Sequence, residues 1–136
     1  MSDVLQLEIV TPEKQVVSDT ADEVQIPGKN GYLGILPGHA PLITELAVGE
    51  IVYRKDGHSN YLSVAWGFAE VLPTKVTILA EAAELPDEID VQRAQESRDR
   101  AEQRLKSQDP NTDYDRALTA LQRATVRLDV AGKKHG

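Results

Sequence analysis

The chain has 136 residues, a mass of 14.9 kDa and a formal net charge of −7. This length suits one compact domain, or a small domain with an appendage, and is too short for a barrel enzyme of about 250 residues. The absence of cysteine excludes a disulfide scaffold, thiolate metal sites and cysteine nucleophiles. No apolar run approaches the roughly 20 residues that span a bilayer, so we expect no direct bilayer insertion. The N-terminal residues lack a basic region and a long apolar core, so we expect no secretory signal.

Charge and composition both change near residue 87. Residues 1–86 carry twelve acidic and five basic residues, whereas residues 87–136 carry ten of each. Neither part has an obvious basic face, so no nucleic acid partner is expected. Glycine, proline and aromatic residues concentrate before residue 87, and Ala, Arg, Gln, Glu and Leu after it. The chain is therefore predicted to have a β-rich part followed by a helical part.

The first part contains several short segments with strand periodicity. Apolar residues alternate with polar ones in 5–9, 24–26 and 50–55, which predicts strands with one buried face. Asp56-Gly57 supplies a tight hairpin turn before a returning strand at 61–64. Two further strands are expected at 68–72 and 76–80, and strands this short and frequent predict an antiparallel sandwich or a barrel.

The second part is predicted to form an antiparallel hairpin of two helices. Asp87 is expected to cap the first helix, which runs to about Lys106. Thr112 and Asp115 resemble a capping box at the start of the second helix. The expected seam between the helices consists of Val91, Ala94, Ala101 and Leu105 from the first, with Arg98 at a seam position, and Tyr114, Ala117, Leu118, Leu121, Ala124, Thr125, Leu128 and Ala131 from the second.

Such a seam is thin. A buried leucine contributes about 1.5–3 kcal/mol and alanine far less, and two short helices are marginally stable alone. We therefore expect the hairpin to depend on docking against the β-rich part. It is then either a static cap or a weakly held element that acts as a switch.

The sequence offers no recognisable catalytic or metal-binding motif. The three histidines, His39, His58 and His135, lack metal-ligand spacing, and the last two are expected on the solvated surface. The glycine-rich stretch 28–38 matches neither a phosphate loop nor a dinucleotide fingerprint, and there is no nucleophile elbow. We therefore expect no catalytic site, and the only enzymatic alternative is an acid–base hydrolase that uses His39.

The segment Gly31–Leu42, which reads GYLGILPGHAPL, fixes a particular series of turns and resembles the epsilon subunit of bacterial F-type ATP synthases. The resemblance extends from about residue 4 to residue 131, nearly the whole chain. It implies an N-terminal antiparallel β-sandwich in 1–86 and a C-terminal two-helix hairpin in 87–136. The other matching segments are Val10–Pro12, Gly67–Val71, Val76–Glu84 and Leu121–Ala131.

The resemblance also implies a function. The epsilon subunit is a non-catalytic part of the central stalk that binds the gamma subunit and the membrane rotor ring and helps to couple proton flow to ATP synthesis. In bacterial members the hairpin extends along gamma into the alpha/beta catalytic head and blocks ATP hydrolysis. The implied location is peripheral, at the cytoplasmic face of the bacterial inner membrane.

The family's ring-facing loop corresponds to Asn30, Gly31, Tyr32 and the neighbourhood of His39. Some bacterial relatives carry an acidic residue where this chain has Tyr32. A second interpretation of His39 is that it braces the turn 37–41 instead of contacting another subunit.

Some family members bind ATP as a regulatory ligand, without any required cofactor, through Ile or Leu followed by Asp-x-x-Arg-Ala. The matching residues here are Ile89-Asp90-Val91-Gln92-Arg93-Ala94. In an antiparallel hairpin Arg127 lies level with Arg93, so three guanidiniums, with Arg123, are placed to converge on a triphosphate. The implied ATP residues are Glu84, Ile89, Asp90, Arg93, Ala94, Arg100, Arg123 and Arg127, of which Glu84 (adenine) and Arg100 (phosphate) rest on the resemblance alone.

A simpler explanation of these residues remains open. Asp90 favours the start of the helix and pairs with Arg93, while Arg123 and Arg127 pair with Glu96 and Asp129. If ATP does bind, it stabilises the folded hairpin by mass action. The alternative function is a free-standing β-sandwich module that senses nucleotide without binding gamma.

Overall fold

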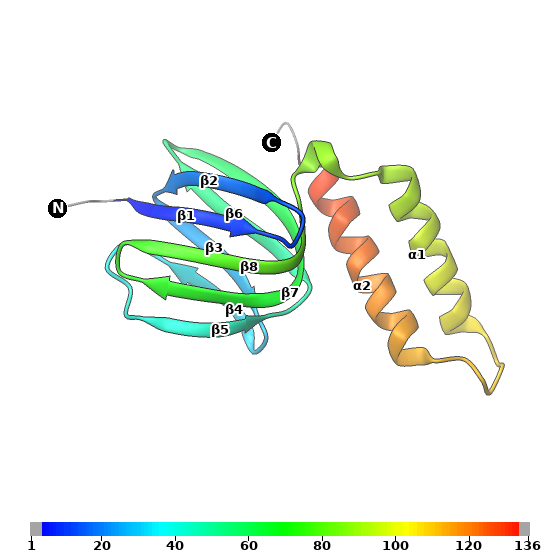
Figure 1. Ribbon diagram of the computed structural model, residues 1–136. Helices are drawn as coiled ribbons and strands as arrows, with labels where there is room; N and C mark the ends of the chain where they lie inside the picture. Colours follow the sequence, from blue (N-terminus) through cyan, green and yellow to red (C-terminus); the bar gives the residue numbers. More distant parts are fainter. Residues whose placement is uncertain (1–3, 134–136) are drawn as a thin grey trace.

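The computed structural model describes residues 4–133 and has two parts, a β-sandwich and a helical hairpin (Figure 1). The hairpin projects from one end of the sandwich, with its second helix next to the sandwich and its first helix outside. This confirms the predicted fold class; His135 lies outside the described residues. The elements are β1 (Leu5–Val10), β2 (Gln15–Ala21), β3 (Glu23–Gly28), β4 (Gly31–Ile35), β5 (Leu42–Leu46), β6 (Gly49–Lys55), β7 (His58–Leu72), β8 (Lys75–Glu84), the 3-10 helix η1 (Pro86–Glu88), α1 (Val91–Lys106) and α2 (Tyr114–Ala131).

The strand order is β2-β1-β8-β7-β5-β3-β4, and β6 pairs with both β3 and β7. All pairs are antiparallel except β1 with β8, which run parallel. Strand β7 serves both layers because its residues 58–64 pair with β6 and its residues 67–71 pair with β5. The chain 61–72, which was predicted as two strands, is therefore a single bent strand.

The bend in β7 lies at Trp66 and Gly67, which both have positive φ, 55° at Trp66 and 122° at Gly67. Ala65 pairs with Ala82 and Gly67 with Ala80, so the register to β8 is unchanged across the bend and no extra residue is inserted. Positive φ at two successive residues interrupts the extended backbone of the strand, so the bend comes from these backbone angles.

The core lies between the two layers of the sandwich. The alternating residues Leu5, Leu7 and Ile9 of β1 are fully buried, as the periodicity predicted. Three strands were not predicted, β2, β4 and β5, since none of them has a clean alternation of apolar and polar residues. The largest fully buried side chains are Leu5, Leu7, Ile9, Ile26, Ile35, Ile51, Leu62 and Ile78.

The helices begin at other residues than predicted. Asp87 lies in η1 and Ile89 is extended, so α1 begins after Asp90, whose carboxylate accepts a hydrogen bond from the Arg93 backbone N–H at 3.1 Å. In the same way Asp113 caps α2, in place of the predicted capping box, by accepting from the Arg116 N–H at 3.0 Å. Both residues are Asp at the N-cap, where a short acidic side chain satisfies an unpaired helical N–H.

The seam of the hairpin is made mainly of alanine. Ala94 and Ala101 of α1 and Ala117 and Ala124 of α2 are buried, which confirms a thin seam. Because small side chains let the two helices approach closely, the larger residues beside them are turned outward. Three residues predicted for the seam are therefore exposed, Val91 by 43%, Tyr114 by 45% and Leu118 by 47%.

Candidate functional site

The junction between α2 and the sandwich concentrates polar contacts. Arg127 of α2 donates two hydrogen bonds to the Glu84 carboxylate at the end of β8, from Nε at 2.7 Å and from Nη2 at 3.1 Å. The two side chains are 22% and 29% exposed. A bidentate, partly buried pair of this kind fixes orientation as well as charge. The pairing of Arg127 with Asp129 that the sequence left open is therefore replaced by one with Glu84.

One helical turn away, Arg123 lies over the indole ring of Trp66, with its guanidinium carbon 5.1 Å from the ring centre. This is the geometry of a cation–π contact. Pairing of Arg123 with Glu96, the other interpretation from the sequence, does not occur. Between the two contacts is a small hollow lined by Val48, Ser63, Val64, Ala65, Ala82, Glu84, Arg123 and Arg127.

Two more ion pairs hold the ends of the junction. Lys133, just after α2, binds Glu50 of β6 at 2.9 Å and lies 5.0 Å from the centre of the Tyr61 ring. The hydrogen bond to Glu50 raises the pKa of Lys133 above its ordinary value. In the β1–β2 turn, Lys14 binds Glu88 of η1 and holds the pKa of that carboxyl below its usual range.

The residues predicted to bind ATP fall into two groups. Glu84, Arg123 and Arg127 line the hollow described above. Arg93 and Arg100 instead border a shallow groove on α1 together with Asp90, Gln92 and Glu96. Ile89 and Ala94 are buried. The structure thus brings three of the predicted residues together at one hollow, while the α1 arginines border another groove.

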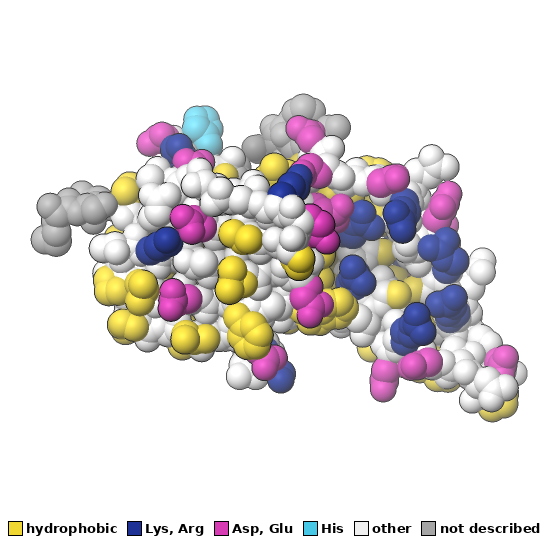
Figure 2. Space-filling view, in the orientation of Figure 1, with side chains coloured by type: hydrophobic (Ala, Val, Ile, Leu, Met, Phe, Trp, Pro, Cys, Tyr) yellow, Lys and Arg dark blue, Asp and Glu magenta, His cyan; other side chains and the backbone are white. Residues whose placement is uncertain are grey.

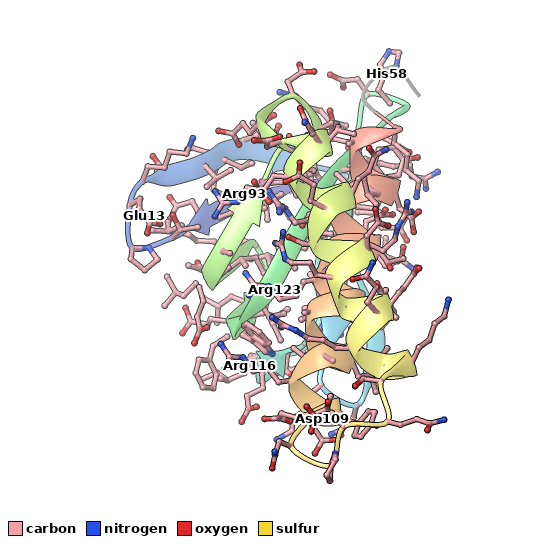
Figure 3. The ribbon with its side chains drawn as sticks, turned by 90° about the vertical axis from the view of Figure 1, so that its right-hand side faces the viewer. Glu13, His58, Arg93, Asp109, Arg116 and Arg123 are labelled. Carbon is pink, nitrogen blue, oxygen red and sulfur yellow. The ribbon has the colours of Figure 1, made fainter. Side chains whose placement is uncertain are left out.

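The two groups nevertheless share one face of the hairpin. Arg-Ala recurs with the same spacing in both helices, at Arg93 and Arg100 in α1 and at Arg116 and Arg123 in α2. Lys and Arg side chains gather over the hairpin beside the sandwich in Figure 2, and Arg93, Arg116 and Arg123 lie on the same side of the helices in Figure 3. Each arginine precedes a buried seam alanine, so the repeat places the guanidiniums in a row beside the seam. This repeat is a sequence signal that the analysis of motifs missed.

The residues predicted to face a rotor ring do not form one patch. Asn30 and Gly31 make the tight turn between β3 and β4, where Gly31 has a φ of 132°. Tyr32 is 57% exposed, and its hydroxyl accepts a hydrogen bond from the Glu50 N–H at 3.1 Å. His39 lies beyond the other end of β4, with Nδ1 2.7 Å from the Ala40 carbonyl oxygen. His39 therefore makes a local contact within its own turn.

The outer face of β5, β7 and β8 carries exposed apolar side chains, which we call the apolar strip. It consists of Ile43, 71% exposed, Phe68, 54%, and Leu79, 56%, and the register pairs Phe68 with Leu79. Yellow side chains on the visible face of the sandwich in Figure 2 follow these strands. The register also places the exposed Glu70 beside Ile43 and Glu45 beside Phe68, so carboxylates lie among the apolar side chains. Exposed apolar side chains grouped on one face are typical of protein–protein contact surfaces.

Within residues 4–133 there is no group of His, Asp and Glu side chains arranged to hold a metal ion. Neither α1 nor α2, in the part of the chain described, is long and apolar enough to cross a membrane.

Comparison with known proteins identifies both parts of the chain. Residues 4–86 match the model of the ATP synthase delta/epsilon chain β-sandwich domain, and residues 87–132 match that of the delta/epsilon chain long α-helix domain. The ATP synthase epsilon chain of Koribacter versatilis is 69% identical over 110 residues, covering 81% of this chain and 78% of that protein. The epsilon chain of Nitratidesulfovibrio vulgaris is 48% identical over 128 residues, covering 94% and 96%.

Two solved structures have a similar fold. A chain of the mitochondrial ATP synthase of Euglena gracilis is matched with a TM-score of 0.80 at 21% identity, covering 96% of this chain and 82% of that one. A chain in the central stalk and c-ring structure of the Tetrahymena thermophila mitochondrial enzyme is matched with a TM-score of 0.55 at 15% identity, covering 97% and 96%. At these identities the likeness bears on the fold alone.

Proposed function

Because the chain belongs to the family of ATP synthase delta and epsilon chains, we propose that it is a central-stalk subunit that helps to couple proton translocation to ATP synthesis. Chains of this family are subunits of the complex and not its catalyst. The observation that carries the proposal is the consecutive match of both family domains over residues 4–132. The location proposed with it is peripheral, at the cytoplasmic face of the bacterial inner membrane.

The apolar strip is proposed to bind the gamma subunit. Ile43, Phe68 and Leu79 present apolar area on a rigid sheet, which suits a permanent contact with another protein. The turn Asn30–Gly31 and the exposed Tyr32 are proposed to face the membrane rotor ring, and His39 is proposed to contact a neighbouring subunit from the opposite end of β4.

Gamma binding separates this role from a free-standing nucleotide sensor. We expect Ile43→Ser to weaken binding of the purified chain to gamma about tenfold or more, since it removes a large exposed anchor. Val4→Ser, which also changes a surface hydrophobic residue but outside the strip, serves as the control. Unchanged gamma affinity in Ile43→Ser would refute the assignment of this surface, and no affinity in the unmodified chain would refute the stalk role.

The hairpin is proposed to regulate the complex by leaving the sandwich and extending into the alpha/beta catalytic head, where it blocks ATP hydrolysis. Supporting this, α1 packs mainly on α2, and α2 is fastened to the sandwich by polar contacts, Arg127 with Glu84 and Arg123 over Trp66, beside few buried apolar residues such as Val130. Removal of residues 87–136 should raise the ATP hydrolysis rate of the assembled complex while assembly is kept. Unchanged hydrolysis after truncation would refute the regulatory role and leave the stalk role standing.

ATP is proposed as a regulatory ligand that favours the folded hairpin. The arginine row beside the seam, which includes Arg93 and Arg123, supplies the cationic groups that a triphosphate requires. In calorimetry with the purified chain, Arg93→Gln should weaken ATP binding at least about tenfold. Arg98→Gln, which changes an α1 arginine outside the row, should bind as the unmodified chain does. Equal affinities of the two variants would contradict the proposed site.

A further inference from the structure

We propose that Arg123 and Arg127 form a two-point clasp that fastens α2 to the sandwich through Trp66 and Glu84. The two arginines are four residues apart and therefore lie on one face of α2, one turn from each other. Their partners lie on the adjacent strands β7 and β8. One cation–π contact and one bidentate ion pair thus hold the same helix face against the same strand pair.

The sandwich side of the clasp is preformed. Positive φ at a bulky residue such as Trp66 is unusual, and backbone strain of this kind persists only where the surroundings impose it. Here they do so within the sandwich: the Trp66 N–H donates to the Ala47 carbonyl at 3.3 Å, and the Gly67 backbone lies so close to Leu79 that no side chain fits. The backbone angles that orient the indole are therefore held by contacts within the sandwich.

On the hairpin side, the clasp residues all lie on α2, and the same helix also carries a matched control residue. Arg116 belongs to the same row of α2, seven residues before Arg123, but its side chain makes no hydrogen bond or ion pair with any residue of 4–133. It borders a groove at the far end of the hairpin, with Arg104 and Asn111. Arg116 is therefore a matched control that tests a guanidinium on the same helix face without a partner on the sandwich.

The clasp makes the hairpin observable, because Trp66 is the only tryptophan of the chain and is half-buried beneath Arg123. Its emission and its accessibility to a quencher report docking directly. The central expectation concerns Arg127, which binds Glu84 and does not lie over the indole. If the two contacts act as one clasp, loss of the Arg127 pair also uncovers Trp66.

The experiment uses the full purified chain, acrylamide quenching of tryptophan emission and far-UV circular dichroism as a check of folding. Arg127→Gln and Arg123→Gln should each red-shift the emission and raise the quenching constant about twofold, as for a half-buried indole that becomes solvated. Arg116→Gln should leave both unchanged. Glu84→Gln breaks the same pair from the sandwich side and decides the question if Arg127→Gln proves unfolded.

Quenching of Arg127→Gln and Glu84→Gln equal to that of Arg116→Gln would overturn the clasp. The readout needs no other subunit and no nucleotide, so it does not rest on the proposed function. If the clasp is confirmed but removal of the hairpin leaves the ATP hydrolysis rate of the complex unchanged, the clasp has a structural role only and the regulatory role is refuted.

Discussion

The bend in β7 allows a sharp test, the substitution Gly67→Ala. Gly67 has a φ of 122°, and a Cβ built on it would lie 2.0 Å from the Leu79 carbonyl oxygen and 2.8 Å from the Ala80 Cα. All of these neighbours are backbone atoms of the paired strand β8. The added methyl group therefore cannot be accommodated by rotation of a side chain, and the β7–β8 ladder itself must move.

Two effects determine the magnitude. Backbone conformations that are sparsely populated by residues other than glycine cost about 1–3 kcal/mol. Overpacking against a rigid neighbour costs about 1–3 kcal/mol more. We therefore expect Gly67→Ala to lower the free energy of unfolding by about 4 kcal/mol and the melting temperature by roughly 14 °C for a chain of this size.

The assay is thermal unfolding of the full chain followed by circular dichroism, with Gly34→Ala as the matched control. Gly34 is also in a strand of the sandwich, but its backbone lies outside the positive-φ region and nothing lies within 4 Å of an added Cβ. The control should melt within about 3 °C of the unmodified chain, or slightly higher, since alanine reduces the entropy of the unfolded state. Equal melting temperatures of the two variants would show that the backbone at Gly67 is not constrained as described.

Two other predictions concern the helices and their attachment. Asp113→Ala, which removes the N-cap, should destabilise α2 by about 1 kcal/mol. Asp115→Ala should cost only about 0.3 kcal/mol, because it removes only an interaction with the helix dipole. Thermal melting of the helices compares the two variants, and equal losses of stability would refute the capping assignment. Glu88 has a lowered pKa because it accepts hydrogen bonds from Lys14 and from the Leu85 N–H. A carboxyl with a lower pKa in the folded state stabilises that state above its unfolded pKa, and the stabilisation is lost as the pH falls through the lowered pKa. The melting temperature should therefore fall more steeply between about pH 6 and about pH 3 in the unmodified chain than in Glu88→Gln, and parallel profiles would contradict the pair's contribution.

The attachment of the hairpin is weak compared with the core. The sandwich is held by fully buried aliphatic side chains such as Leu7, Ile51 and Ile78, each worth about 1.5–3 kcal/mol. The hairpin is held by ion pairs and cation–π contacts near the surface, each worth about 1 kcal/mol or less, and by few buried apolar side chains such as Val130. Its attachment therefore depends less on buried aliphatic side chains than the core does, which is what a hairpin acting as a switch requires.

The sequence by itself determined the division of the chain and most of its elements. Alternation in β1, β3 and β6 sets which side chains are buried, because a strand with one buried face needs period two. Asp56-Gly57 makes the predicted hairpin turn, where both residues have positive φ, 52° and 80°. The change in composition near residue 87 marks the passage from sheet to helices, and the GYLGILPGHAPL segment identifies the family.

Only the tertiary structure decided how the two parts are joined. Trp66 appears in the sequence as one more aromatic residue of a β-rich segment, and nothing local predicts that its ring lies beneath Arg123. Glu84 and Arg127 are 43 residues apart, so their pairing depends on where α2 docks. The seam alanines also determine which face of each helix is buried, and this exposes Tyr114 and Leu118 against expectation. Local periodicity specifies which residues must be buried or capped. Which residues they pack against or bind depends on how distant segments of the chain approach one another.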